Sequence, residues 1–392
     1  MSTERVLETT EALVRCDTQN PPGREEAVVA TATALLAERG CAVEVFDSNG
    51  RPSVLGRYDA DAEPGAPTLL VNGHLDVVPA APETWTRPPF TPVREGDRLY
   101  GRGTADMKGG IAAALEGLSA CQAAGVPVPA HLLFHLVADE ETGGRYGTEA
   151  LANAGLVDAD ACLIPEPTEL KASIAERGSV QARVRVGGAA GHGSEPGTGR
   201  SAIADAATMI TALHGTGYHD LPHPLLGSPT GNVALIEGGV ASNVIAPHCA
   251  FVIDRRTLPG ETADNVLAGL TTKIDEACPG ASYEIESLVE VEPSELPAEH
   301  PFARFVAASA NTTITGLSLG TDGRFLRNRL GIPTVVYGPG SIAQAHTADE
   351  WVSITELTKA ARTFARIFTT FDRHNTGPRL TRPRSRPCPV RP

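Results

Sequence analysis

Acidic side chains cluster at one point of the sequence in a way that an ordinary turn does not require. In HLVADEETGG (135–144) an apolar run ends in Asp139, Glu140 and Glu141, followed by a threonine and two glycines. Adjacent carboxylates repel one another unless a positive charge compensates them, so this stretch suggests a nearby cation. A solvated acidic turn is the alternative, although the preceding run is too apolar for a surface strand.

Four further stretches place a histidine or an acid beside an apolar segment. They are NGHLDVVP with His74 and Asp76, LYGRGTADMKGG with Asp106, LIPEPT with Glu166, and GPGSIAQAHTADE with His346. On a strand, His74 and Asp76 point to the same face, where the acid can fix the tautomer of the imidazole. Each signal is weak alone: His74 could be a satisfied histidine at a strand end, and Asp106 a helix N-cap.

Together these stretches supply two histidines and at least three carboxylates at strand ends of one domain. Open α/β sheets bind ligands at the carboxyl ends of their strands. Mixed nitrogen and oxygen ligands with room for a water suit a pair of divalent cations, of which Zn²⁺ fits best. The sequence therefore predicts a metal centre whose cations offset the repulsion among the acids.

The elements that must position these residues alternate between helix and strand in the first part of the chain. Helices are expected at 24–40, 107–125 and 145–154, and strands at 41–47, 53–59, 68–76, 131–139 and 161–166. The strand at 68–76 is strongly apolar and should be central. Alternating helices and buried strands predict an α/β layer domain.

From residue 178 the pattern changes to strand, helix, strand, strand, helix, strand. The strands are expected at 178–188, 230–238, 247–256 and 281–292, and the helices at 201–215 and 261–278. This order is the split βαβ arrangement of a small α+β domain. We therefore predict a domain at 178–292 inserted into an α/β domain made of 1–177 and 293–372, followed by a disordered Arg/Pro-rich tail at 373–392.

Composition limits the class of protein. With 41% hydrophobic and 20% charged residues, the chain resembles soluble globular proteins, and its formal net charge of −14 argues against a nucleic-acid partner. No signal peptide is recognisable, and no apolar stretch approaches the roughly 20 residues of a membrane span. Seven scattered cysteines without a CxxC motif fit reduced thiols in a cytoplasm. The basic tail could touch nucleic acid or membrane, but a solvated extension is the simpler interpretation.

Five motifs in order, GHLDVVP, YGRGTADMKGG, DEETGG, PEPT and AHTADE, resemble those of the M20 metallopeptidases and deacylases. The resemblance covers about residues 5 to 371 and is nearest to the branch of acetylornithine deacetylase and succinyl-diaminopimelate desuccinylase. It implies a zinc-hydrolase-type α/β catalytic domain with an inserted ferredoxin-like α+β domain for dimerisation. DEETGGRYGTEAL and SLGTDGRF match no single branch, which leaves the acyl group and the amino-acid side chain open.

The resemblance also implies roles for the residues around the metals. It implies two Zn²⁺ per subunit, replaceable by Co²⁺ or Mn²⁺, with His74 and Glu166 on one, Glu141 and His346 on the other, and Asp106 as the bridge. Asp76 would be the partner of His74. Glu140 would be the general base, taking a proton from the attacking water and later protonating the leaving amine.

In the inserted domain the resemblance implies further site residues. His192, in GAAGHGSEP, would reach the active site of the partner subunit and help to hold the oxyanion; a flexible hinge with an incidental histidine is the alternative. Asn243 and Arg256 would hold substrate, although Arg255 could replace Arg256, and a salt bridge would also explain that arginine. Outside the inserted domain, Arg324, in SLGTDGRFL, would be another substrate contact.

These expectations lead to one predicted function and two alternatives. We expect a cytoplasmic homodimer that uses two zinc ions to remove an acetyl or succinyl group from the nitrogen of an amino acid or related small metabolite. The first alternative is a metallo-exopeptidase, a carboxypeptidase or dipeptidase with the same site. The second is a non-catalytic metabolite- or partner-binding relative; loss of a ligand or of Glu140 would mark it, and all of them are present.

Overall fold

The chain forms two compact units in the computed structural model, which describes residues 1–215, 217–218 and 222–380. Unit 1 consists of Met1–Ile174, Leu296–Thr315 and Thr321–Pro392, and unit 2 of Ala175–Glu295 and Gly316–Gly320. The predicted inserted domain, 178–292, falls inside the main segment of unit 2. Residues 316–320, which join the same unit, were not predicted to belong to it.

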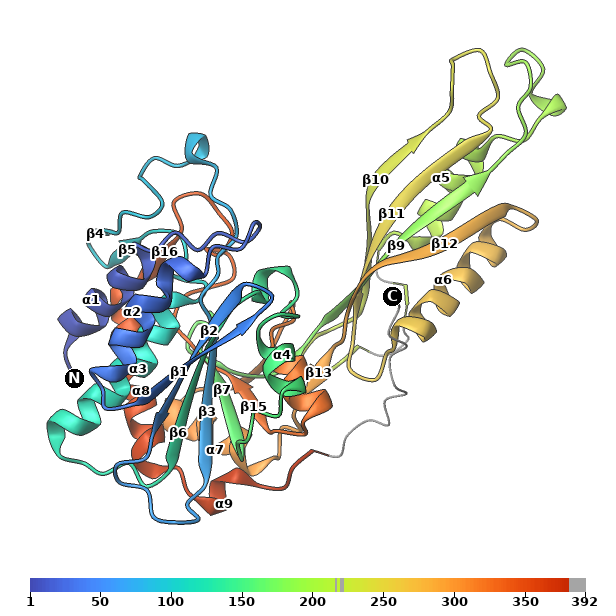
Figure 1. Cartoon of the computed structure of the whole chain (residues 1–392). Helices are drawn as coiled ribbons and strands as arrows, with labels where there is room; N and C mark the ends of the chain where they lie inside the picture. The colour runs from blue at the N-terminus through green and yellow to red at the C-terminus, as the bar shows by residue number, and fades with distance from the viewer. Residues whose placement is uncertain (216, 219–221, 381–392) are drawn as a thin grey trace. The chain divides into compact units, whose positions relative to one another are not determined.

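A mixed sheet carries unit 1 (Figure 1). Its strand order is β1 (Ala42–Ser48), β2 (Arg51–Tyr58), β6 (His131–Val137), β3 (Thr68–His74), β7 (Ala161–Ile164), β15 (Thr334–Val336) and β8 (Ala172–Glu176). Strands β13 (Ser294–Glu295) and β14 (Ile314–Leu317), whose residues belong wholly or partly to unit 2, pair with β8. The central strands β6, β3, β7 and β15 are parallel, whereas β1 and β2 extend the sheet antiparallel. The α/β prediction is confirmed, and β3 is central and buried as expected.

Helices α1 (Thr3–Val14), α2 (Glu26–Ala37), α3 (Lys108–Ala124) and α8 (Ile354–Thr370) lie together on one side of this sheet (Figure 1). Helix α3 can pack closely because it is rich in small residues. A Cβ on Gly110 would lie 1.8 Å from the carbonyl oxygen of Pro165, and one on Gly117 would lie 2.8 Å from Cβ of Phe364. The first of these contacts brings the start of α3 against the segment that carries Glu166.

Smaller elements complete unit 1. Strands β16 (Trp351–Ser353), β5 (Arg98–Tyr100) and β4 (Val93–Glu95) form a separate small sheet, and helices α4 (Thr148–Asn153), α7 (Pro301–Ala310) and α9 (Arg373–Thr376) are short. Residues 373–380, which the sequence assigned to a disordered tail, instead include α9 and a hydrogen bond from Leu380 N to Gly331 O at 2.8 Å. The rest of the predicted tail, 381–392, lies outside the described residues.

Unit 2 has the predicted order of elements. They are β9 (Gly178–Gly187), α5 (Ala202–Leu213), β10 (Thr230–Gly238), β11 (His248–Thr257), α6 (Ala263–Ala277) and β12 (Ser282–Val291). The sheet order is β10-β11-β9-β12, with every neighbouring pair antiparallel. Both helices pack on the alternating apolar side chains of these strands, such as Val184, Phe251 and Ile253. This is the split βαβ domain that the sequence predicts.

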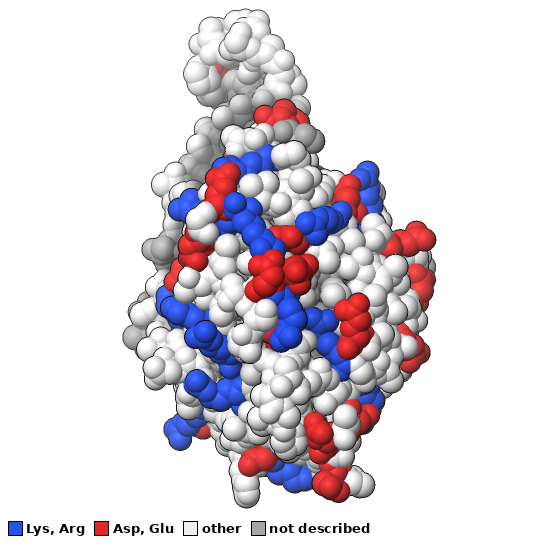
Figure 2. Space-filling view, turned by 90° about the vertical axis from the view of Figure 1, so that its left-hand side faces the viewer, with Lys and Arg blue, Asp and Glu red and all other residues white. Residues whose placement is uncertain are grey.

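The surface carries interspersed charges of both signs on the face that Figure 2 shows, which looks onto the α1 side of unit 1. Ion pairs on this side include Arg94 with Glu4 at 2.9 Å and Arg15 with Glu11 at 3.0 Å. Among the described helices, none combines the length and the hydropathy needed to cross a membrane.

Candidate metal centre

Three ligand-bearing segments leave the same edge of the large sheet. Strands β3 and β6 are parallel, with His74 opposite Val137, and β7 is parallel to β3. The carboxyl ends of parallel strands meet at one edge. His74 therefore ends β3 close to the short turn after β6 that carries Glu140 and Glu141, and close to Glu166 after β7.

Asp106 lies between two histidines. Its Oδ1 is 3.0 Å from Nε2 of His74, and its Oδ2 is 3.3 Å from Nε2 of His346. Glu166 Oε1 is 3.4 Å from the same nitrogen of His74, and Glu141 Oε2 is 3.0 Å from that of His346. Two His–Glu pairs thus face the two oxygens of one carboxylate, and the structure brings all five predicted ligands together.

The donor set fits divalent cations. Ligand atoms of His74, Glu140 and Glu166 lie within 4.8 Å of one another, as do those of His74, Asp106 and Glu141. Glu141 Oε1 is buried and has no hydrogen-bond partner among the described residues. Such a buried oxygen is costly unless a cation satisfies it. Imidazole nitrogens combined with carboxylate oxygens suit Zn²⁺, Co²⁺ or Mn²⁺ better than soft metals.

Acids and histidines perturb one another strongly at this centre. Burial lowers the pKa of His74, but hydrogen bonds to Asp106 and Glu166 outweigh it and raise this pKa well above its ordinary value. Hydrogen bonds to Asp106 and Glu141 raise the pKa of His346 to about 10, and burial raises that of Glu166 to about 8. The centre therefore holds protons where cations can replace them.

Glu140 differs from the ligands in its surroundings. Burial raises the pKa of its carboxyl group well above the ordinary value, and neighbouring Asp322 adds to the shift, although His74 opposes it. A half-buried carboxylate whose pKa is raised beside a candidate metal centre has the properties of a general base. Its assignment as the base stays a prediction.

Asp76 supports the turn after β6 rather than only the histidine. Its Oδ1 accepts the backbone N–H of Glu140 at 3.2 Å, and its Oδ2 accepts that of Glu141 at 3.1 Å. Nδ1 of His74 is 2.8 Å from the backbone oxygen of Asp76 but 3.7 Å from Oδ1. Burial raises the pKa of this carboxyl group to about 7. At hydrogen-bond distance, the predicted partner of the His74 imidazole is therefore the backbone oxygen of Asp76 and not its carboxylate.

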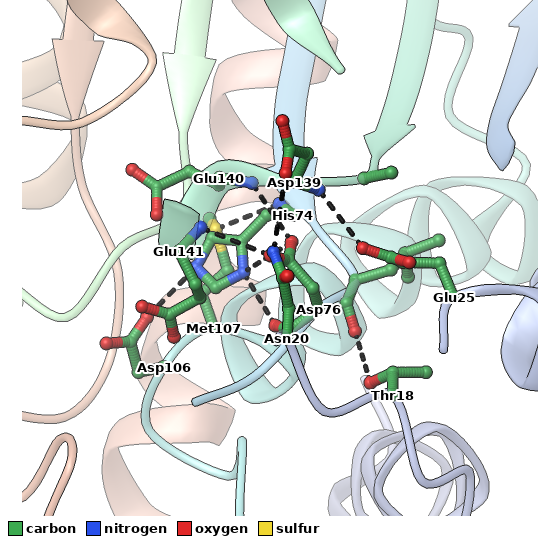
Figure 3. A network of polar contacts seen from close by, with 12 residues as sticks. Thr18, Asn20, Glu25, His74, Asp76, Asp106, Met107, Asp139, Glu140 and Glu141 are labelled. Carbon is green, nitrogen blue, oxygen red and sulfur yellow. Dashed lines mark hydrogen bonds and ion pairs between the residues drawn. The ribbon is translucent and has the colours of Figure 1, made fainter. Parts of the chain in front are cut away.

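Asp139, the first of the three consecutive acids, points away from its two neighbours (Figure 3). It adopts a left-handed conformation with φ of 70°, and its carboxylate lies 3.0 Å from Arg51 Nη1. It also accepts hydrogen bonds from Thr142 Oγ1 at 2.6 Å and Tyr146 N at 3.0 Å. One acid of the opening motif therefore has a protein cation as its partner, and only the other two face the metal centre.

Glu350 is a buried acid that the sequence analysis missed. Its Oε1 accepts the N–H of Ala105 at 2.8 Å and that of Asp106 at 3.1 Å. Its Oε2 accepts the N–H of Gly103 at 3.0 Å and Nη1 of Arg102 at 2.6 Å. Glu350 thereby holds the loop that presents Asp106. In the sequence, the only signal for Glu350 was its position four residues after His346. A solvated glutamate at that position would show the same pattern.

The candidates in unit 2 lie in a pair of adjoining loops. His192 bridges to Val244, and Gly193 N donates to Asn243 O at 2.8 Å, so the predicted residues His192 and Asn243 come together. Both are exposed. Nδ1 of His192 accepts the backbone N–H of Ser194 at 3.2 Å and lies 2.6 Å from its hydroxyl.

The predicted substrate arginines are paired with protein groups. Arg256 Nη2 lies 2.8 Å from Asp254, which is the salt bridge considered from sequence, while Arg255 is buried against Glu261 at 2.7 Å. Arg324 is also buried; it donates to Gly143 O at 2.7 Å, on the loop that carries the consecutive acids. Their contacts with substrate stay predictions.

The chain belongs to peptidase family M20/M25/M40, whose model matches residues 70–370. It is a metal-dependent hydrolase of amide bonds. Acetylornithine deacetylase of Erwinia tasmaniensis is 33% identical over 321 residues, which cover 79% of this chain and 82% of that protein. Acetylornithine deacetylase of Salmonella arizonae is 36% identical over 314 residues, which cover 76% and 78%.

Solved structures support the fold. Aminopeptidase PepT from Bacillus cereus matches with a TM-score of 0.78 at 21% identity, covering 94% of this chain and 98% of that one. An M20 family metallo-carboxypeptidase from Sulfolobus solfataricus matches with a TM-score of 0.74 at 18% identity, covering 94% and 99%. At these sequence identities, the similarity to the solved structures shows the fold and not the substrate.

Proposed function

We propose that this protein is a two-zinc amidohydrolase that removes an acetyl or succinyl group from the nitrogen of an amino acid or related small metabolite. The position of Asp106, with one oxygen toward each histidine, carries the proposal, because a bridging carboxylate needs this arrangement. The relatives named acetylornithine deacetylase favour an N-acyl amino acid over a peptide as substrate.

Each residue of the centre has a defined task in this proposal. His74 with Glu166 would hold one ion and His346 with Glu141 the other, and Asp106 would contribute an oxygen toward each pair. The bound ions supply Lewis-acid polarisation of the amide carbonyl and a lowered pKa for water. Glu140 accepts the proton of the attacking water and passes it to the leaving amine, a transfer that its raised pKa favours.

His192 is proposed to donate a hydrogen bond to the oxyanion of the reacting carbonyl in the partner subunit. Its Nδ1 accepts the N–H of Ser194, so a neutral His192 carries its proton on Nε2. That nitrogen is the donor that an oxyanion needs. Arg256, Asn243 and Arg324 are proposed to contact the substrate, with the carboxylate of an amino acid as the group that suits an arginine.

We propose that unit 2 forms a homodimer. Its edge strand β10 and the turn that follows expose Leu235, Ile236 and Val240, at 66%, 56% and 61% of their surface. Such apolar exposure on an edge strand suits pairing with a second copy. Leu235→Glu should shift the protein toward monomer in sedimentation velocity. Val126→Glu, at an equally apolar exposed position of unit 1, should not, and an unchanged dimer in both would refute this surface.

We place the enzyme in the cytoplasm. All six cysteines within the described residues are free thiols, and four of them are buried. Unpaired buried thiols suit a reducing compartment.

Amine release from one substrate panel tests the function. The zinc-loaded protein is assayed on N-acetyl amino acids, N-succinyl amino acids and dipeptides, with and without a chelator. We expect chelator-sensitive turnover of one N-acyl amino acid. Preference for dipeptides would replace the deacylase by an exopeptidase, and no turnover by zinc-loaded protein would overturn the proposal.

A further inference from the structure

We propose that Asn20 is a positioning residue that fixes the Glu140–Glu141 turn through Asp76 and Thr142. The inference rests on the proposed function for its effect on turnover, but its effect on metal binding does not depend on the substrate. Asn20 belongs to neither the metal ligands nor the substrate contacts, and its side chain lies in the network of Figure 3.

The main chain of Asn20 is held independently of the turn. Asn20 N donates to Val77 O at 2.9 Å, and Val77 N donates to Thr18 O at 3.1 Å. Thr18 Oγ1 donates a hydrogen bond to Leu75 O at 2.7 Å and accepts one from Nζ of the buried Lys108 at 2.8 Å. The segment before Asn20 is thus tied to the chain that follows β3, so the amide group starts from a fixed place.

The side-chain amide joins two separate hydrogen-bonded systems. Nδ2 donates to Asp76 Oδ2 at 2.8 Å and to Thr142 Oγ1 at 2.9 Å, which uses both of its hydrogens. Asp76 in turn accepts the N–H groups of Glu140 and Glu141. Thr142 donates onward to Asp139. Asn20 therefore clamps the turn at both ends.

The chemistry of the pocket requires a donor at this position. Asn20 is 2% exposed, and Asp76 is fully buried. The carboxylate of Asp139 lies 3.5 Å from the same Nδ2. With acid oxygens on two sides, the amide nitrogen and not its oxygen must face them, and loss of the amide leaves Asp76 without one of its donors.

A displaced turn would affect the two glutamates differently. Glu141 would bind metal less tightly, since partners behind a ligand are typically worth about 10- to 100-fold in affinity or activity. Glu140 would be displaced from the reacting proton, and a misplacement of about 1 Å can reduce rate about 100-fold. KM should stay nearly constant, because Asn20 touches no substrate group.

Asn20→Ala, Asn20→Ser and the control Asn72→Ala test the proposal. Asn72 is equally buried, lies on β3 beside His74 and bonds only Thr148 among the described side chains, so its loss reports the general cost of removing a buried amide. Zinc affinity is measured by chelator competition. The kinetic constants kcat and KM are measured at saturating zinc, and Tm is measured by calorimetry.

We expect Asn20→Ala to lower zinc affinity and kcat each about 10- to 100-fold with KM nearly unchanged. Asn20→Ser keeps one hydrogen-bond donor, so its zinc affinity and kcat should lie between those of Asn20→Ala and the parent protein. The serine variant also keeps the proposal testable if the alanine variant does not fold. Asn72→Ala should lower Tm alone. Zinc affinity and kcat unchanged in both Asn20 variants would overturn the role. A parent protein inactive on acyl amino acids would refute the proposed function, while the zinc measurement would still decide on Asn20.

Discussion

The two units treat their polar candidates in opposite ways. In unit 1, His74 and Glu166 are 1% and 4% exposed, and each faces another member of the centre. In unit 2, His192 and Asn243 are exposed, and the histidine has only its neighbour Ser194 as side-chain partner among the described residues. His74 and Glu166 are thus enclosed by their own unit, although His346 of the same centre is 54% exposed. His192 and Asn243 are both presented to solvent.

This difference separates two kinds of functional residue. Buried acids and histidines that contact one another are costly unless protons or cations balance them, so these residues of unit 1 suit a metal centre. Exposed residues such as His192 and Asn243 are solvated and remain available to bind a partner. The proposed partners are the substrate and the active site of a second subunit.

The largest expected effect belongs to unit 1. Glu140→Gln should lower kcat about a thousandfold or more, because the amide cannot accept the proton of water. Zinc content, measured by atomic absorption, should remain near that of the parent. Near-normal turnover would show that another group is the base.

A substitution of His192 in unit 2 should give the next largest loss of kcat, and activity should return when two inactive variants are mixed. His192→Ala should lower kcat about 100-fold by removing an oxyanion donor, while zinc affinity stays constant. His248→Ala, another exposed histidine of unit 2, is the control. Mixing His192→Ala with Glu140→Gln should restore activity in heterodimers, where one site combines an intact Glu140 with an intact His192. Verified heterodimers without recovery would remove the role in the partner subunit.

Sequence reasoning identified unit 1 well because its ligands follow apolar strands. His74, the turn after β6 and Glu166 could be grouped once three parallel strands were expected, since their carboxyl ends must meet. Asn20 and Glu350 could not be found in this way. Both lie in irregular segments without periodicity, and what distinguishes them is their buried partners, which only the folded chain brings together: Asp76 and Thr142 for Asn20, and the N–H groups of the Asp106 loop for Glu350. Residues 373–380 were misassigned for the same reason, because their contacts are long-range.

A substitution of Glu350 should weaken metal binding in unit 1 by a smaller amount, through the structure of the Asp106 loop. In Glu350→Gln the new NH₂ group must face either the N–H groups of Ala105 and Asp106 or those of Gly103 and Arg102, since each oxygen already accepts two donors. Zinc affinity should fall about 10- to 100-fold as the Asp106 loop relaxes. Glu116→Gln, which removes the ion pair between buried Glu116 and the partly exposed Arg5, should lower Tm without this loss of zinc affinity. Equal zinc affinity in both variants would argue against a loop-holding role.

The pH dependence of zinc binding follows from the protons that the ligands of unit 1 hold when no cation is bound. His346, with a pKa raised to about 10, and Glu166, raised to about 8, must lose their protons before they can bind a cation, as must His74. Zinc binding should therefore weaken as pH falls, by about tenfold per pH unit for each proton displaced. Chelator competition at pH 6, 7 and 8 measures this slope, and the contribution of His346 should disappear above about pH 10. A constant affinity between pH 6 and 8 would mean that the ligands hold no such protons. The contrast between a proton-balanced centre in unit 1 and the solvated residues of unit 2 would then lose its physical basis.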